Sequence, residues 1–270
     1  LVGAMMAGLV ACTPQQEKQQ TPPTNEFNYM VENFADLGIL RYRVPDFENL
    51  TTQQKALVYY LNEAALWGRD ILCDQNCRYN LRIRRACETI YLNYTGDKTT
   101  EEWKAFELYL KRIWFANGIH HHYSEDKILP TCSRAWFEEA CAHCGVQLDD
   151  EVMAVIFDPT VMAKKVNSVT GQDLCLTSAC NYYENVTQAE AEAWYAAHKD
   201  NSPEPKWIGL NSKLTKNEQG EVIERVFKAT EDGLYREALV HVVENLEKAL
   251  VYAENDKQRE VISKLIEFNK

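Results

Sequence analysis

The chain has 270 residues, of which 46% are hydrophobic, so it is long enough to bury one large core or two small ones. Its formal net charge is −11, and no run of Lys and Arg is dense enough to follow a phosphate backbone, which argues against nucleic acid as a partner. No uninterrupted apolar stretch reaches the roughly 18 residues that a membrane-spanning helix needs.

The first twelve residues are typical of the signal segment that precedes the mature part of a bacterial lipoprotein. Leu1 to Cys12 reads "LVGAMMAGLVAC", an apolar stretch of small residues like the end of a secretory signal. Its last four residues resemble a lipobox, whose cysteine becomes lipidated. A Gln/Pro-rich stretch that cannot pack a core follows at once. We therefore expect a signal remnant at 1–11, a tether at 12–26, a lipid anchor on Cys12 as the sole membrane attachment, and a place in the bacterial cell envelope. The alternative is a buried apolar segment with a chance cysteine.

Eight cysteines remain if Cys12 carries lipid. An envelope compartment permits disulfides, but the sequence does not give their pairing, and buried free thiols are an equal alternative. Cys141 and Cys144 have the C-x-x-C spacing of redox and metal sites. Their flanks predict a helix followed by a loop, not the βαβ setting of a redox motif, so we expect a disulfide or packed thiols there.

Capping boxes and apolar stripes predict a series of helices. Thr51 with Gln54, Thr99 with Glu102 and Thr187 with Glu190 each match the capping-box pattern. Apolar residues at helical spacing then predict helices over 57–65, 83–94, 103–114, 239–250 and 261–266. Gly118 stands where the glycine after a helix belongs.

Strands are predicted in two places only. Val152 to Phe157 is a short β-like apolar run that Asp158-Pro159 stops, and the stretches "KWIGLNSKL" and "EVIERVFKA" flank a Gly-containing turn at 215–220. The expected fold class is therefore α+β, predominantly helical with a small antiparallel β portion.

Three consecutive histidines, His120 to His122, follow Gly118. In a strand, His120 and His122 would share one face, and zinc needs three or four ligands. No HExxH pair exists in the chain to supply a helical zinc grip. We therefore expect the histidines to line a cleft or support a loop, and we predict neither a catalytic residue nor a metal ligand among these 270 residues. The alternative is a metal carrier that uses the histidines with Cys141 and Cys144.

Several stretches, in unbroken order from about Phe27 to Lys270, together resemble the dipeptidyl peptidase III family of Bacteroides-type bacteria. They are "ILRYRVPDFENLTTQQKALVYYLNEAALWGRDI", "WKAFELYLKRIWFANGIHHHYSEDKILP", "VIFDPTVMAKKVN", "LTSACNYYENVTQAEAE", "GLNSKL" and "LEKALVYAENDKQREVISKLIEFNK". Family members are zinc exopeptidases that release dipeptides from the N-termini of oligopeptides. The resemblance implies that residues 27–270 form the N-terminal part of the lower lobe, which contains part of a β-barrel, and that the chain is incomplete relative to the family.

The family's HExxGH zinc signature is not in this sequence. The resemblance thus implies that the zinc ligands belong to a missing C-terminal half and that the 270-residue chain alone is inactive. It also implies that Asn117, Gly118, His122 and Tyr123 bind the oligopeptide substrate, with His120 and His121 orienting their loop. The alternative function is a non-catalytic envelope lipoprotein that binds peptides.

Overall fold

The computed structural model describes residues 27–206, 208, 209 and 211–270, and it divides after Val44 into two compact units. The described part of the first unit is a hairpin, in which β1 (Met30–Phe34) pairs antiparallel with β2 (Leu37–Leu40). A register shift between Met30 and Glu32 interrupts the pairing. Cys12 and the expected boundaries at 1–11 and 12–26 lie outside the described residues.

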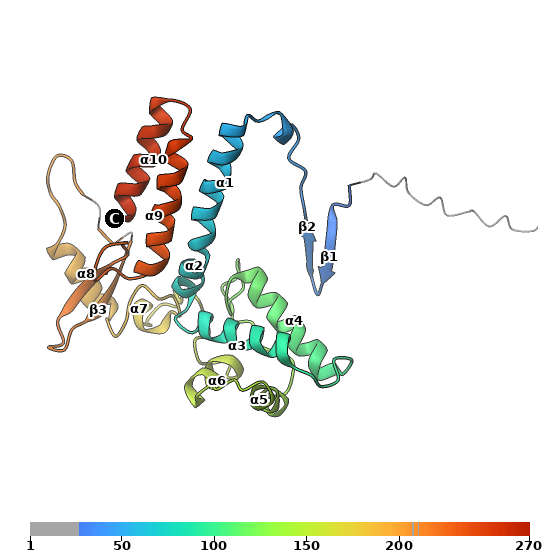
Figure 1. Ribbon diagram of the computed structural model, residues 1–270. Helices are drawn as coiled ribbons and strands as arrows, with labels where there is room; N and C mark the ends of the chain where they lie inside the picture. The colour runs from blue at the N-terminus through green and yellow to red at the C-terminus, as the bar shows by residue number, and fades with distance from the viewer. Residues whose placement is uncertain (1–26, 207, 210) are drawn as a thin grey trace, which may run out of the picture. The chain divides into compact units, whose positions relative to one another are not determined.

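The second unit, 45–270, contains the remaining elements (Figure 1). In chain order these are the 3₁₀ helix η1 (Phe47–Asn49), α1 (Thr52–Trp67), α2 (Arg69–Asn76), α3 (Asn80–Asn93), α4 (Glu101–Ala116), α5 (Arg134–His143), α6 (Asp150–Phe157), α7 (Leu174–Thr177), α8 (Gln188–Ala197), β3 (Ser212–Lys216), β4 (Val222–Val226), α9 (Arg236–Val251) and α10 (Asp256–Asn269).

Side-chain caps start two of the three helices for which the sequence predicts a capping box at the expected residue. Thr51 accepts a hydrogen bond from Gln54 N and Thr187 accepts one from Glu190 N, each within a complete capping box, so both predictions are confirmed. The prediction of a box at Thr99 is wrong. Thr100 caps α4 instead by accepting from Trp103 N, and Thr99 donates to the Asp97 carboxylate.

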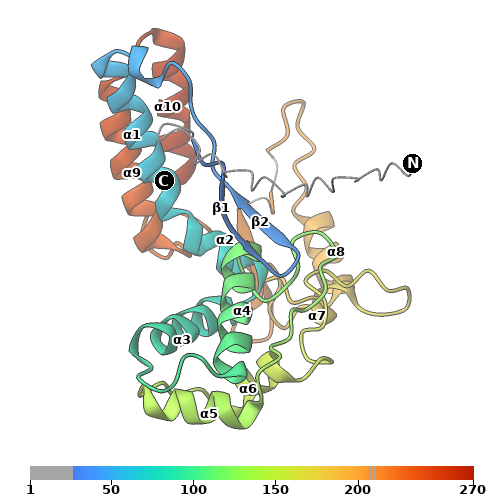
Figure 2. The ribbon, with the colours of Figure 1, turned by 90° about the vertical axis from the view of Figure 1, so that its right-hand side faces the viewer.

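The largest core lies among α3, α4, α5 and α6, which Figure 2 shows as one group. Its members include fully buried aromatic and branched side chains such as Phe106 of α4, Phe137 of α5 and Ile83 of α3. Burial of each such side chain contributes roughly 1.5–3 kcal/mol to folding. Ile119, which directly precedes the three histidines, is one of the buried residues of this core.

The predicted strand at Val152 to Phe157 is wrong, because these residues form most of α6. Asp149 begins the helix by accepting a hydrogen bond from Val152 N at 2.9 Å. Val152, Met153, Val155 and Ile156 are all buried in the same core, so tertiary packing overrides the β preference of the run.

A second core lies in the bundle of α1, α9 and α10, which lie side by side in Figures 1 and 2. The apolar stripes of α9 and α10 supply Leu246, Ile262 and Ile266, and α1 supplies Leu57. The two predicted closing helices are therefore confirmed. Their packing follows from the i, i+3, i+4 spacing of these residues.

The predicted hairpin at 215–220 is also confirmed, with β3 and β4 paired antiparallel from Ser212–Val226 to Lys216–Val222. Leu214 of β3 packs with Val186 and Ala191 in a small third core. The fold is α+β and predominantly helical, and its two described sheets are two-stranded ribbons that are not closed. Within the described residues, no helix is both long enough and apolar enough to cross a membrane.

Candidate functional site

The histidine segment leaves α4 through a left-handed turn. Asn117 ends the helix at φ 56°, and Gly118 follows at φ 145°, with its N–H donating to Ile113 O at 3.0 Å. A Cβ atom on Gly118 would lie 2.2 Å from Asn80 Nδ2, so any larger residue would overlap that side chain. Gly118 therefore has both a conformational and a steric reason to be glycine. A glycine does follow α4, as predicted, but the left-handed residue that ends the helix is Asn117 and not Gly118.

Asn80, at the start of α3, holds the beginning of the histidine segment by hydrogen bonds. Its side chain is fully buried; Oδ1 accepts from Ile119 N at 3.0 Å, and Nδ2 donates to Cys73 O at 2.9 Å. Asn76 Nδ2 adds a bond to Asn117 O at 3.2 Å. Because a buried amide with both ends paired is costly to disturb, these bonds hold the start of the segment against α2 and α3. Sequence reasoning missed Asn80, since apolar periodicity gives no signal for a buried polar residue.

His120 is buried, with only 3% of its surface exposed, and it pairs with Lys127 in an isolated antiparallel bridge. Its Nε2 lies 2.7 Å from Met162 O, so this nitrogen carries the proton that the carbonyl accepts. Nδ1 has no hydrogen-bond partner among the described residues. Burial lowers the pKa of His120, because the charged ring would lose its hydration.

His121 shapes the turn beyond this bridge. Its Nδ1 accepts from Tyr123 N at 3.2 Å and from Ser124 N at 3.1 Å, so that nitrogen is unprotonated. Its backbone N–H donates to Asp126 O at 2.7 Å. These contacts fit the loop-orienting role that the resemblance implies for His120 and His121. They also place His120 and His122 in different surroundings, because the chain turns at His121 instead of continuing as a strand.

His122 and Tyr123 lie at the exposed end of the turn. The His122 ring packs edge-on against the Phe115 ring at a centroid distance of 5.1 Å. The centroid of the Tyr123 ring lies 4.4 Å from that of the His122 ring. Tyr123 is 86% exposed. These two residues and the turn 121–126 are called the loop tip below, and 117–120 with Asn80 the loop base. An exposed aromatic ring beside an imidazole offers an apolar face with a hydroxyl and a ring nitrogen for binding.

Residues 158–165 contact the end of the loop at residues 125–127. Lys127 Nζ donates to Asp158 O at 2.6 Å and to Val161 O at 2.7 Å, which satisfies the carbonyls where α6 ends. Burial lowers the pKa of Lys127 to about 8. Lys164 pairs with Asp126, and Lys165 Nζ lies 3.5 Å from Glu125 Oε1. Residues 125–127, which follow Tyr123, are therefore held by contacts with residues 158–165, whereas Tyr123 itself is exposed.

The four predicted site residues fall into two places. His122 and Tyr123 share the loop tip, whereas Asn117 and Gly118 belong to the loop base. A cavity of about 390 Å³ beside the loop is lined by His121, Ser124, Asp126 and Lys127 together with residues of α4. Asn117 instead lines a cavity of about 420 Å³ with residues of α2, α3 and α4.

In the part of the chain that the structure describes, no three His, Cys, Asp or Glu side chains are arranged so that they could hold a metal ion. The eight cysteines from Cys73 to Cys180 are all free. Cys141 is buried, and burial raises the pKa of its thiol to about 11, so it is protonated near neutral pH. This favours the packed-thiol interpretation of the C-x-x-C pair.

No family model matches the chain, and no curated protein matches it. Among solved structures, the chain is similar to one described as "Structure of DPP III from Caldithrix abyssi", with a TM-score of 0.49 and 17% sequence identity. The similarity covers 82% of this chain and 31% of that chain, so the chain spans about a third of that protein. At this identity and TM-score, the likeness carries no conclusion about activity.

Proposed function

We propose that this chain supplies the substrate-positioning part of a dipeptidyl peptidase III-like hydrolase, which releases dipeptides from the N-termini of oligopeptides. Support comes from the resemblance of the six sequence stretches, in order, between Phe27 and Lys270. The structural observation that carries the proposal is the loop tip, where an exposed Tyr123 and a half-buried His122 project from a firmly hydrogen-bonded base. Positioning a peptide needs this combination, since an ordered binding surface loses little entropy when the ligand arrives.

Zinc, which the family uses, does not fit the residues described here. Nε2 of His120 is engaged by Met162 O, and Nδ1 of His121 accepts two backbone N–H groups. Both nitrogens would have to lose these bonds before ligating a metal, and zinc needs three or four ligands. We therefore assign no catalytic step to this chain. Its part is to hold the peptide, and the zinc ligands would come from another part of the full-length protein.

The loop tip gives the proposal a direct test in the 270-residue chain. His122→Ala and Tyr123→Ala should each weaken binding of a tetrapeptide with a free N-terminus, measured by calorimetry or by a C-terminal fluorescent label. His198→Ala and Tyr59→Ala are matched controls, because both residues are exposed and belong to other segments, His198 directly after α8 and Tyr59 on α1. Equal affinity for all four variants would contradict the assignment of the tip.

Catalysis is tested separately. The 270-residue chain should release no dipeptide from the same tetrapeptide, with or without added zinc. In a longer protein that joins this segment to an HExxGH helix, the same two substitutions should lower kcat/KM for dipeptide release. Dipeptide release by the 270-residue chain alone would overturn the proposal that this chain only positions the peptide. If the longer protein bound the peptide without hydrolysing it, a non-catalytic binding protein would be favoured.

The proposal includes a location in the bacterial cell envelope, with a lipid on Cys12 as the membrane attachment. It is supported by the Leu9-Val10-Ala11-Cys12 sequence and by the Gln/Pro-rich stretch that follows it. Labelling with a radioactive fatty acid in a bacterial host should mark the protein, and Cys12→Ala should remove the label. Retention of the label by that variant would contradict the anchor.

A further inference from the structure

A second recessed surface lies outside the loop tip. The cavity of about 420 Å³ that Asn117 lines adjoins another of about 550 Å³, because both are lined by Leu66 and Asp70. The second cavity continues past Trp67 to Arg236, at the start of α9. Each volume lies within the range of roughly 300–1,000 Å³ that is typical of ligand sites. These two cavities together are called the α2–α3 groove.

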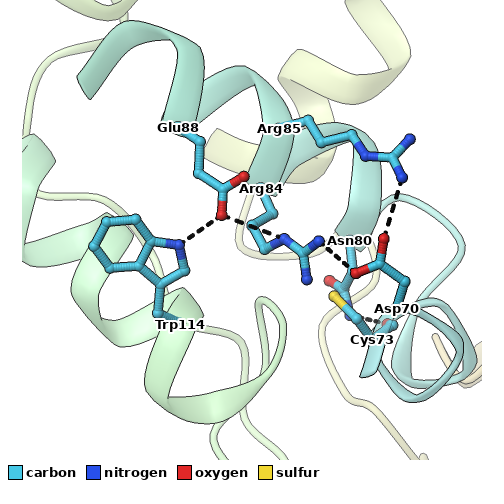
Figure 3. Close-up of polar contacts among 7 residues, drawn as sticks. All are labelled: Asp70, Cys73, Asn80, Arg84, Arg85, Glu88 and Trp114. Carbon is cyan, nitrogen blue, oxygen red and sulfur yellow. Dashed lines mark hydrogen bonds and ion pairs between the residues drawn. The ribbon is translucent and has the colours of Figure 1, made fainter. Parts of the chain in front are cut away.

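Several residues that line the groove form an ion-paired network, whose contacts are drawn in Figure 3. Arg84 Nη2 lies 2.6 Å from Asp70 Oδ1, and Arg85 Nη2 lies 3.2 Å from Asp70 Oδ2. Arg84 Nε also lies 3.4 Å from Glu88 Oε1, which accepts a hydrogen bond from Trp114 Nε1 at 2.8 Å. These contacts fix the side chains of α2, α3 and α4 relative to one another.

Burial of Asp70 alone would raise the pKa of its carboxyl, but hydrogen bonds and attraction from Arg84 and Arg85 outweigh it, so the pKa is lowered. Asp70 therefore stays ionised near neutral pH and keeps both guanidinium groups in place. Both oxygens of the Asp70 carboxylate are paired with guanidinium groups, so this carboxylate is not available to bind a cationic ligand.

Two further guanidinium groups line the groove without a partner. Arg69 lines the smaller cavity and Arg236 the larger one, and neither makes a hydrogen bond or an ion pair with any residue that the structure describes. In all, four arginines line the groove against three carboxylates, those of Asp70, Glu88 and Glu237. The groove thus carries excess positive charge on a chain whose net charge is −11. Arginine is suited to bidentate pairing with carboxylates.

Apolar and aromatic surface flanks these charges. Trp114 lines the smaller cavity and Trp67 the larger, and each is 42% exposed. Leu66, also exposed, lies at the junction of the two cavities. Exposed indole rings next to unpaired guanidinium groups are typical of surfaces that bind peptides through a few aromatic and Arg contacts.

We propose that the α2–α3 groove binds a peptide segment that carries both acidic and aromatic side chains. Arg69 and Arg236 pair with its carboxylates, while Trp67 and Trp114 contact its aromatic rings. The ion pairs of Asp70 and Glu88 form the floor beneath it. The groove needs no free N-terminus on its ligand, so this site is separate from the proposed binding of an oligopeptide substrate at the loop tip.

The test uses the ¹⁵N-labelled 270-residue chain and the acetylated, amidated peptide Ac-Phe-Glu-Glu-Phe-NH₂. Acetylation removes the free amino group that the substrate of the proposed dipeptidyl peptidase carries, so failure of this proposal and failure of the proposed function are distinguishable. The chain has six tryptophans, and the indole N–H signals of Trp67 and Trp114 are assigned by their absence from Trp67→Phe and Trp114→Phe. Both signals should shift on titration.

Arg69→Gln and Arg236→Gln should each weaken the binding roughly two- to fivefold, as expected for one exposed ion pair, and added salt should weaken it further. Arg225→Gln is the matched control, since Arg225 is exposed on β4 and lines neither cavity. Because Arg69 and Arg236 have no partners in the described structure, these variants should keep the wild-type Tm.

Three results would overturn the proposal. The first is that neither indole signal shifts up to millimolar peptide. The second is that Ac-Phe-Gln-Gln-Phe-NH₂ binds as tightly as the acidic peptide, which would remove the role of the guanidinium groups. The third is that Arg225→Gln weakens binding as much as Arg69→Gln does, which would indicate diffuse attraction to the protein surface.

Discussion

The base and the tip of the histidine loop are adjacent in sequence but differ in almost every physical respect. At the base, Asn80 and His120 are buried and make specific hydrogen bonds, and Gly118 lies too close to Asn80 for any side chain. At the tip, Tyr123 is largely exposed and makes ring contacts only with its neighbours. The base therefore determines the conformation of the loop, whereas the tip is available for a ligand. Substitutions in the base should therefore reduce stability, and substitutions in the tip should reduce binding.

The largest effect is expected for Gly118→Ala. The new Cβ would overlap Asn80 Nδ2, and the φ of 145° is unfavourable for any residue but glycine. We expect the free energy of unfolding to fall by about 3–5 kcal/mol, measured by urea denaturation. Gly171→Ala is the control, because Gly171 also has a positive φ but open space around its Cβ position. That variant should lose about 1–2 kcal/mol, and equal losses would show that the contact with Asn80 does not matter.

Asn80→Ala should come next. It would leave Ile119 N–H and Cys73 O buried without their partner, which costs about 2–3 kcal/mol of unfolding free energy. Asn76→Ala removes a single, partly buried bond to Asn117 O and should cost about 0.5–1 kcal/mol. Urea denaturation of both variants gives the comparison. If Asn76→Ala proved the more damaging, Asn80 would not be the anchor of the base.

A smaller effect is expected from the titration of His120. Burial lowers its pKa below the ordinary value of 6.5, and Met162 O, Lys127, Lys165 and Glu125 surround it. Below pH 6.5 the unfolded chain therefore binds the proton more readily than the folded protein does, so stability is lost as the pH falls from 6.5 through the folded-state pKa.

His120→Gln keeps a donor for Met162 O but does not titrate. Its unfolding free energy should vary less between pH 7 and pH 5 than that of the wild type, as followed by urea denaturation at each pH. His198→Gln removes an exposed histidine and should keep the wild-type dependence. An unchanged slope in His120→Gln would mean that other groups cause the pH dependence.

The smallest effect on stability is expected at the tip. Tyr123→Ala removes a side chain that is 86% exposed and has only neighbouring ring contacts, so the free energy of unfolding should change by no more than about 0.5 kcal/mol. Differential scanning calorimetry would show this as an almost unchanged Tm. A loss comparable to that of Asn80→Ala would mean that the tip also supports the fold.

Local signals in the sequence predict much of the fold. The capping boxes at Thr51 and Thr187 begin helices as expected, and the apolar stripes of α9 and α10 mark the faces that pack into the bundle. Val152 to Phe157 was predicted as a strand because a short apolar run has no clear period. In the structure, Asp149 caps it as a helix, and Val152, Val155 and Ile156 are buried at i, i+3 and i+4 spacing on one face.

The sequence predicts less of the candidate site than of the fold. The histidine run and Gly118 indicate where a loop leaves a helix, but not that the chain turns at His121 or that His120 is buried. Those outcomes depend on Asn80 and Met162, which lie 40 and 42 residues from His120 in the chain. The polar network of the α2–α3 groove likewise joins residues of three helices. The i, i+4 spacing of Arg84 and Glu88 is a local pattern, but none predicts the pairing of Arg84 with Asp70 or of Glu88 with Trp114.

The most direct test of the central claim, that the loop tip binds the first residues of an oligopeptide, is a titration of the ¹⁵N-labelled chain followed by its backbone amide signals. A tetrapeptide with a free amino group should shift the signals of residues 121–126 and leave that of Ile119 in the base unchanged. The Tyr123→Ala chain should show far smaller shifts with the same peptide. Equal shifts in Tyr123→Ala and the wild type, or no shift within 121–126, would contradict the account.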